Sequence, residues 1–147
     1  MRIMHSQPPN FPLRHAQIWG AGVDLCQIER VQAAYARQGE RLLQRLLTPA
    51  EQSVFHQRQS ENAARGVQYL AGRFAAKEAL AKALGTGIRS MMGFQAASIL
   101  SDELGKPWVQ THGELTKMFE REHLLAHISL SDEADLVLAY CVIEKRG

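Results

Sequence analysis

Two carboxylates and a lysine are the residues of this chain best suited to chemistry. Glu78 and Lys82 are four residues apart in the stretch RFAAKEALAKALGTG (residues 73–87), so on a helix they share one face. Asp24 follows the apolar pair Gly22-Val23 in an expected strand, where the pattern gives no reason for an acid. Mg²⁺ in proteins prefers one or two carboxylates, with waters and substrate phosphates completing its octahedron. Asp24 and Glu78 could therefore hold a magnesium ion if the fold brings them together.

Each of these features also has a purely structural interpretation. Glu78 and Lys82 could be a solvated pair that stabilises a helix by about 0.3–0.5 kcal/mol, and Asp24 could be a helix N-cap. Gly85-Thr86-Gly87 is typical of a helix C-cap, although flexible glycines also let backbone amides approach a phosphate. His127 lies on an expected strand, where a lone histidine is more often structural than catalytic. From the residues alone, both interpretations stay open.

A basic segment follows the first expected strand. Arg30 and Arg37 are seven residues apart, on one face of an expected helix, and Arg41 and Arg45 extend the positive charge. Such a run is usually a solvated face, but it could also dock an acidic partner, because local positive charge speeds that encounter. The formal net charge of +2, with a single aromatic residue (Tyr35) in this stretch, argues against a nucleic-acid-binding protein.

Helical and strand periodicities indicate the elements that must position these residues. A strand is expected over residues 18–25, ending at Asp24, followed by helices over residues 28–39, around the leucines at 42–47, and over residues 62–84. Later elements are strands over residues 94–100 and 108–111, a helix over 114–123, and a hairpin of 126–130 and 136–143 with its turn at 132–135. Because helices precede strands, the pattern predicts an α+β fold, with a mainly antiparallel sheet packed against a long central helix.

Two local signals refine these helices. Thr48-Pro49-Ala50-Glu51 is a capping box, in which the threonine hydroxyl and the glutamate carboxylate satisfy backbone amides at a helix start. On the long helix, small residues fill the arc beside the charged ones, so that another backbone can pack closely there: Ala75, Ala76, Ala79 and Ala83.

Length and composition limit the class of protein. With 147 residues, 46% hydrophobic and 22% charged, the chain suits a single domain over residues 18–147, after an irregular leader over residues 1–17. No apolar run approaches the roughly 18 residues of a membrane helix, and no secretory signal is expected. Cys26 and Cys141 have no CxxC partner, which favours a cytoplasmic protein without disulfides or structural zinc. The glycine fingerprints of Rossmann and P-loop nucleotide enzymes are absent.

Taken in order, several segments resemble the holo-[acyl-carrier-protein] synthase family of 4′-phosphopantetheinyl transferases. They are Gly22-Val23-Asp24-Leu25 with Ile28-Glu29-Arg30, then Arg45-Leu46-Leu47-Thr48, the run LAGRFAAKEA (residues 70–79), KALGTGI (residues 82–88), Gly105-Lys106-Pro107 and His127-Ile128-Ser129. The Phe-x-x-Lys-Glu-Ala-x-x-Lys string with an upstream Gly-x-Asp is specific, and the resemblance spans about residues 20–144. Two features depart from the family: the leader is longer, and Leu130-Ser131-Asp132 stand where many relatives have a second histidine.

The resemblance implies a Mg²⁺-dependent enzyme that transfers 4′-phosphopantetheine from coenzyme A to a serine of apo acyl carrier protein, leaving adenosine 3′,5′-bisphosphate. Asp24 and Glu78 would bind Mg²⁺ and, with Lys82, form the catalytic set. Arg73 and Lys82 would hold the coenzyme A phosphates beside the backbone of Gly85. The proton acceptor for the serine stays open between Glu78, Asp24 and a metal-bound water.

The resemblance also implies partners. Relatives are typically homotrimers with active sites between subunits, and Pro107 and His127 would line the nucleotide pocket from the same or a neighbouring subunit. Arg30, Arg37 and Arg41 match the face that docks the acidic helix of the carrier protein. The alternative is a module of the same fold that binds coenzyme A or a carrier protein without transfer. Neither a membrane nor a nucleic acid is expected as a partner.

Overall fold

The computed structural model describes residues 17–89 and 91–147, so the expected leader, apart from Gln17, lies outside the described residues. Within them the elements are, in order, β1 (Gln17–Gln27), α1 (Ile28–Gln38), α2 (Glu40–Leu46), α3 (Pro49–Glu61), α4 (Ala63–Leu84), the 3₁₀ turn η2 (Phe94–Ala96), β2 (Ala97–Ser101), β3 (Pro107–Thr111), α5 (Gly113–Glu122), β4 (Leu124–Glu133) and β5 (Leu136–Lys145).

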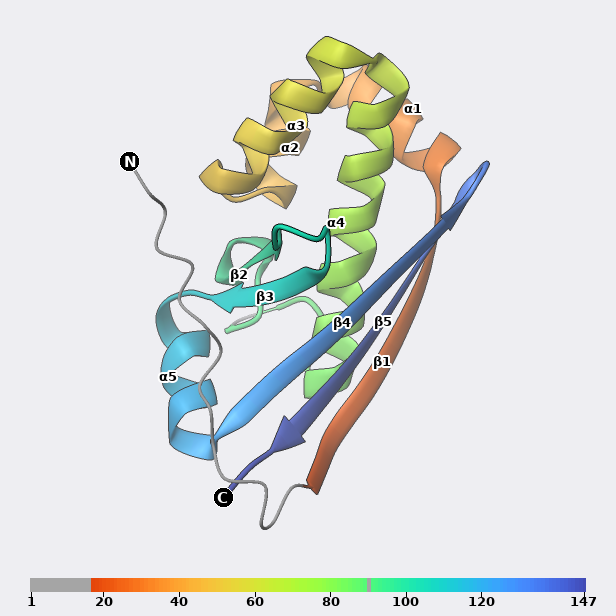
Figure 1. Ribbon diagram of the computed structural model, residues 1–147. Helices are drawn as coiled ribbons and strands as arrows, with labels where there is room; N and C mark the ends of the chain where they lie inside the picture. The colour runs from red at the N-terminus through yellow and green to blue at the C-terminus, as the bar shows by residue number, and fades with distance from the viewer. Residues whose placement is uncertain (1–16, 90) are drawn as a thin grey trace.

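An antiparallel sheet of order β1-β5-β4 packs one face against the long helix α4, and β2 and β3 form a separate antiparallel hairpin. Figure 1 shows α1–α3 gathered at one end of α4, with the hairpin and α5 beside its other half. The predicted α+β class, with antiparallel sheet against a long helix, is confirmed.

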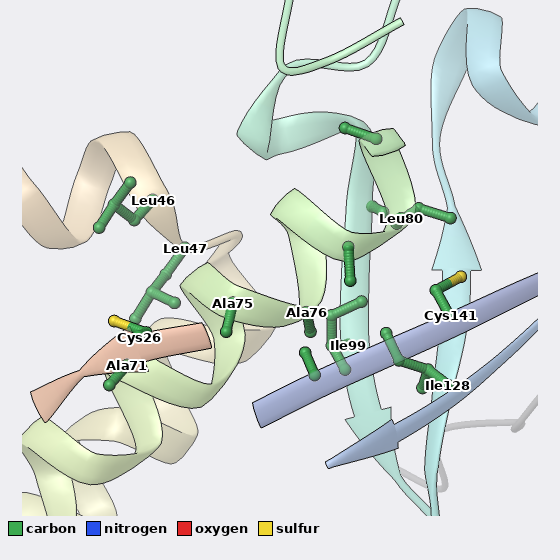
Figure 2. Packing of buried hydrophobic residues seen from close by; sticks show 14 of the residues in the cluster. Cys26, Leu46, Leu47, Ala71, Ala75, Ala76, Leu80, Ile99, Ile128 and Cys141 are labelled. Atoms are coloured by element: carbon green, nitrogen blue, oxygen red, sulfur yellow. The ribbon is translucent and has the colours of Figure 1, made fainter. Parts of the chain in front are cut away.

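The ends of α4 follow directly from local chemistry. The Asn62 side chain accepts the amide of Ala64 at 2.8 Å and begins the helix. Gly85 adopts φ +83°, a left-handed conformation that glycine reaches without steric cost, and ends it. The predicted helix over residues 62–84 is therefore confirmed. Its apolar face forms the centre of the core, where Ala75, Ala76 and Leu80 lie fully buried (Figure 2).

The strand β1 passes so close to α4 that two of its positions have no room for a side chain. A Cβ atom on Gly20 would overlap the carbonyl oxygen of Ala83, and one on Gly22 would overlap that of Ala79. The expectation that the alanines of the long helix admit another backbone is confirmed at these two positions. Since side chains alternate along a strand, the face that turns Gly22 toward α4 also turns Asp24 toward it.

Three details of the predicted elements are wrong. The first strand continues to Gln27, which is the N-cap of α1, so Asp24 is not a helix cap. Phe94–Ala96 forms a 3₁₀ turn before β2 instead of the beginning of that strand. The final hairpin pairs Glu133 directly with Leu136, which leaves a two-residue turn where four residues were expected. In the first and third cases the pairing of strands extends further than the sequence pattern indicated, whereas β2 begins three residues later than expected.

Candidate active site

Asp24, Glu78 and Lys82 meet where β1 crosses α4. Lys82 Nζ donates to the carbonyl oxygen of Val23 at 2.8 Å and to Oδ1 of Asp24 at 3.2 Å. The Asp24 side chain is 17% exposed and that of Lys82 51%, so the pair sits at the protein surface with the carboxylate turned inward. The expected convergence of these three residues is observed, and the ion pair that Lys82 forms is with Asp24.

Asp24 and Glu78 line the same cavity, and the charge of Asp24 acts on Glu78. Burial is the main cause that raises the pKa of Glu78, the negative charge of Asp24 raises it further, and Lys82 opposes both. Among the described residues no group of three His, Cys, Asp or Glu side chains could enclose a metal. Two carboxylates at an open surface fit Mg²⁺, which commonly keeps several waters and binds substrate phosphates. The site therefore suits that ion better than a metal that needs a closed protein cage.

A cavity of about 480 Å³ opens beside these acids, between α1, α2 and α4. Asp24 and Glu78 line it together with an apolar wall: Cys26, Val31, Ala34, Leu42, Leu46 and Phe74. Its basic lining residues are Arg30, Arg37 and Arg45, whereas Arg41 is exposed on α2 and does not line it. The cavity thus combines a negative end, an apolar wall and positive charge.

Arg73 and Pro107 line a second cavity, of about 330 Å³, and neither residue lines the first. The Arg73 guanidinium donates through Nε to the carbonyl oxygen of Ile99 at 3.0 Å and lies 4.3 Å from the centre of the Tyr69 ring. Arg58 and Arg65 also line this cavity, which makes it strongly positive. Within one chain, Arg73 therefore lines a different cavity from Asp24, the partner of Lys82.

The remaining expected site residues lie apart. His127 projects from β4 on the sheet face opposite α4, and its Nε2 lies 2.7 Å from Oε1 of Glu144. Hydrogen bonds to the Glu144 carboxylate lower its pKa, and the bond from Arg146 has a larger effect than the bond from His127. The backbone N–H of Gly85 bonds to the carbonyl oxygens of Ala81 and Lys82. It therefore caps α4, and its amide is already used.

One buried group was not expected from the sequence. Lys77 and Glu51 form a wholly buried ion pair of 2.6 Å. Glu51 was expected only as part of a capping box, and Lys77 only as part of the Phe-x-x-Lys-Glu-Ala string. The signal that could have found the pair is the position of Lys77, next to the apolar Ala75-Ala76 and Leu80 of the helix.

Comparison with known proteins gives a consistent result over nearly the whole chain. A model of the 4′-phosphopantetheinyl transferase superfamily matches residues 20–141. The holo-[acyl-carrier-protein] synthase of Methylibium petroleiphilum is 46% identical over 127 residues, which cover 86% of this chain and 96% of that protein. The corresponding protein of Leptothrix cholodnii is 42% identical over 130 residues, covering 88% and 98%.

Solved structures agree in fold. The crystal structure of holo-[acyl-carrier-protein] synthase from Neisseria meningitidis superposes with a TM-score of 0.80 at 42% identity, covering 88% of this chain and all of that one. The Bacillus anthracis enzyme, solved in complex with coenzyme A (3′,5′-ADP), has a TM-score of 0.73 at 30% identity, covering 87% and 97%.

Proposed function

Because the chain belongs to the holo-[acyl-carrier-protein] synthase family of the 4′-phosphopantetheinyl transferase superfamily, whose enzymes move phosphopantetheine from coenzyme A to apo acyl carrier protein, we propose that it performs this transfer with Mg²⁺ and releases adenosine 3′,5′-bisphosphate. The convergence of Asp24, Glu78 and Lys82 beside an open cavity carries the proposal. In this proposal these three residues form the reaction centre, and their proximity supports it.

In this proposal Asp24 and Glu78 would hold the magnesium ion. A bound Mg²⁺ would supply positive charge near the pyrophosphate of coenzyme A, where negative charge spreads during phosphoryl transfer. Lys82 lies 3.2 Å from Asp24 and can turn its exposed ammonium toward the same phosphates. Its charge then remains fixed near the leaving group through the reaction.

The serine hydroxyl of the carrier attacks the β-phosphorus of coenzyme A, and the bond to the bridging oxygen of adenosine bisphosphate breaks. The hydroxyl proton needs an acceptor. Asp24 is paired with Lys82, whereas Glu78 makes none of the side-chain hydrogen bonds or ion pairs found over residues 17–89 and 91–147. Glu78 is therefore the carboxylate better placed to take the proton.

Two copies of the chain hold one coenzyme A in this proposal. Arg73 and Pro107 line a cavity separate from that of Asp24 and Glu78, which suits a site shared between subunits. The sheet face opposite α4 is apolar and exposed, with Val23, Leu25, Leu138 and Tyr140 between 41% and 61% accessible. Contiguous apolar surface of this kind is typical of an interface between proteins. We therefore propose the homotrimer that the resemblance implies.

The first cavity also suits the acyl carrier protein. Its positive residues Arg30 and Arg37, joined by Arg41 on α2, favour an acidic helix, and its apolar wall favours one apolar side chain of that helix. Arg30→Glu should raise the KM for the carrier about tenfold or more and leave the KM for coenzyme A within twofold. Arg121→Glu on α5, an exposed arginine elsewhere, is the matched control. Equal rises in both KM values would contradict the docking role.

The transfer itself is tested by intact mass measurement. The protein is incubated with coenzyme A, Mg²⁺ and an apo carrier protein, and the carrier should gain the mass of one phosphopantetheine group. EDTA should abolish the gain. Binding of coenzyme A without any gain on several carriers would instead favour a non-catalytic module of the same fold.

Among the helices of residues 17–89 and 91–147, none combines the length and the hydropathy that spanning a membrane requires. The cytoplasmic location stays a prediction from the two cysteines, both of which are free and buried.

A further inference from the structure

The side chains of Glu51 and Lys77 are fully buried, and every polar atom of both has a hydrogen-bond partner. Lys77 Nζ donates to Oε1 of Glu51 at 2.6 Å and to the carbonyl oxygens of Leu46 and Phe94, each at 2.8 Å. Glu51 also accepts the amide of Thr48 through Oε1 and that of Ile99 through Oε2, both at 2.8 Å. An ammonium has three donors, so Lys77 uses all of them.

These contacts join four separate segments to α4. Leu46 ends α2, Thr48 caps α3, Phe94 begins η2, and Ile99 lies in β2. Glu78 is the next residue along α4 after Lys77. The pair therefore holds these four segments against the part of α4 that carries Glu78.

The end of α2 depends strongly on such contacts. With seven residues, α2 is too short to be stable alone, and its last carbonyl groups have no partner within the helix. Lys77 takes the carbonyl of Leu46, Gln52 takes that of Leu47, and Gln95 takes those of Gln44 and Leu47. Each distance is between 2.8 and 3.0 Å.

The short helix held in this way forms one wall of the cavity at the carboxylates. Leu42, Arg45 and Leu46 of α2 line the cavity together with Phe74 and Glu78 of α4. The distance between the two walls is therefore set where Lys77 binds the end of α2.

We propose that Glu51 and Lys77 are a positioning pair for the carrier protein: they fix α2 against α4 and so set the width of the cavity that receives the carrier. This inference rests on the proposed transfer function. Neither residue touches a substrate, and both act through Arg45 and Leu46. Removing the pair should weaken carrier recognition and leave the use of coenzyme A unchanged.

A paired replacement separates this role from simple stability. Removing one partner leaves an uncompensated buried charge and is strongly destabilising, whereas replacing both partners of a buried ion pair by neutral groups of similar volume is often tolerated. The double variant Glu51→Gln/Lys77→Met keeps the volume of both side chains. The glutamine can still accept one amide and the methionine fills the path of the lysine stem.

The experiment measures KM for the carrier and for coenzyme A separately, with cooperative thermal unfolding as proof of folding. The double variant should show a KM for the carrier raised about tenfold, with the KM for coenzyme A within about twofold of the parent. Ile143→Val, which removes one buried methyl group from β5, is the control for a general loss of packing, and it should change neither KM.

Gln95→Ala tests the same idea without touching the buried charges. It removes two hydrogen bonds to the end of α2 from an exposed side chain, and should raise the KM for the carrier about threefold, again selectively. The inference is overturned if Gln95→Ala, and the double variant where it folds, leave the KM for the carrier unchanged, or if both KM values rise together. A parent protein that transfers nothing would refute the proposed function and the inference with it, which distinguishes the two failures.

Discussion

Two carboxylates that share a cavity repel each other, and in this protein the repulsion is only partly relieved. Lys82 pairs with Asp24, but the pKa of Glu78 stays raised, by its burial first and by Asp24 second. A divalent cation between the two acids would favour the ionised form of both. The arrangement is thus suited to a bound cation that in turn binds a phosphate.

Replacing one of these acids should therefore stop the reaction without unfolding the protein. We expect Glu78→Gln to lower the rate of transfer at least about 100-fold, because a metal ligand and the best-placed proton acceptor are lost together. Transfer is followed by the mass of the carrier and folding by circular dichroism. Glu114→Gln makes the same change on exposed α5 and should leave the rate as it is. Near-normal turnover of Glu78→Gln would remove Glu78 from the metal site.

The convergence of these residues was predictable in part. The spacing of Glu78 and Lys82 and the unexplained acid at Asp24 were visible in the sequence, and the structure brings all three together. The separation of Arg73 from Lys82 was not visible. They lie nine residues apart on one helix, but Arg73 contacts β2 and Lys82 contacts β1, and their spacing does not reveal these partners. Burial of Lys77 depends in the same way on segments distant in the chain.

At the scale of elements, the contact between β1 and α4 places the acids, and glycine makes it possible. Gly22 lies two residues before Asp24, and Gly22→Ala would make a Cβ atom overlap the carbonyl oxygen of Ala79. We expect a loss of about 2–3 kcal/mol in the free energy of unfolding, because backbone must move to admit the methyl group. Transfer should fall as well, since Asp24 shifts with the strand.

A second glycine on the partner helix provides the control. At Gly72 of α4 the nearest atom to a new Cβ would be Cγ1 of Val137, at 4.0 Å. Gly72→Ala should stabilise the protein by about 0.5–1 kcal/mol, because alanine favours a helix interior. Urea unfolding of both variants checks the pair. Similar free energies of unfolding for Gly22→Ala and the parent would show that β1 is not in close contact with α4.

Helix ends were easier to predict than strand ends. Asn62, Gly85 and the Thr48–Glu51 capping box act within a few residues of the chain, so their effect can be inferred from the sequence. Strands end where their partners end. β1 extends to Gln27 because it pairs with β5 as far as Leu136, which lies more than 100 residues away. That pairing is a long-range property that periodicity does not contain.

For the whole molecule, a buried thiol and a buried phenol should limit the stability of the fold at alkaline pH. Burial raises the pKa of Cys141 to about 12 from 9.0, and that of Tyr69 to about 12 from 10.0. Above pH 9 the unfolded chain loses these protons while the folded chain keeps them, so stability present at pH 8 is lost as the pH rises toward 12. Each group contributes up to about 1.4 kcal/mol per pH unit in that range.

Thermal unfolding between pH 8 and pH 11 checks this expectation. Cys141→Ala removes one of the two titrating groups. The midpoint temperature of unfolding of this variant should therefore fall less steeply with pH than that of the parent, even if the variant is less stable at pH 8. Cys26→Ala serves as comparison, because the Cys26 side chain is less completely buried than that of Cys141. Parallel pH profiles for the parent and Cys141→Ala would contradict the buried-thiol argument.

The proposed assembly makes the sharpest prediction, because a shared site can be divided between two inactive chains. The parent should have a mass of about 49 kDa, three times the 16.4 kDa of one chain. If one subunit supplies Glu78 and its neighbour supplies Arg73, then Glu78→Gln and Arg73→Gln should each be inactive alone. When the two variants are co-expressed, an Arg73→Gln chain, which keeps Glu78, can lie beside a Glu78→Gln chain, which keeps Arg73, and the site between them is complete.

Random mixing of the two variants makes about a quarter of the sites intact, so about a quarter of the parent activity should return. Asp24→Asn mixed with Glu78→Gln is the matched control. Both residues line the same cavity of one chain, so every site in that mixture carries a defect and no activity should return. Native mass spectrometry confirms that mixed trimers have formed. If such trimers contain both variants and remain inactive, the two cavities do not cooperate across an interface, and Arg73 has no part in the site of its neighbour.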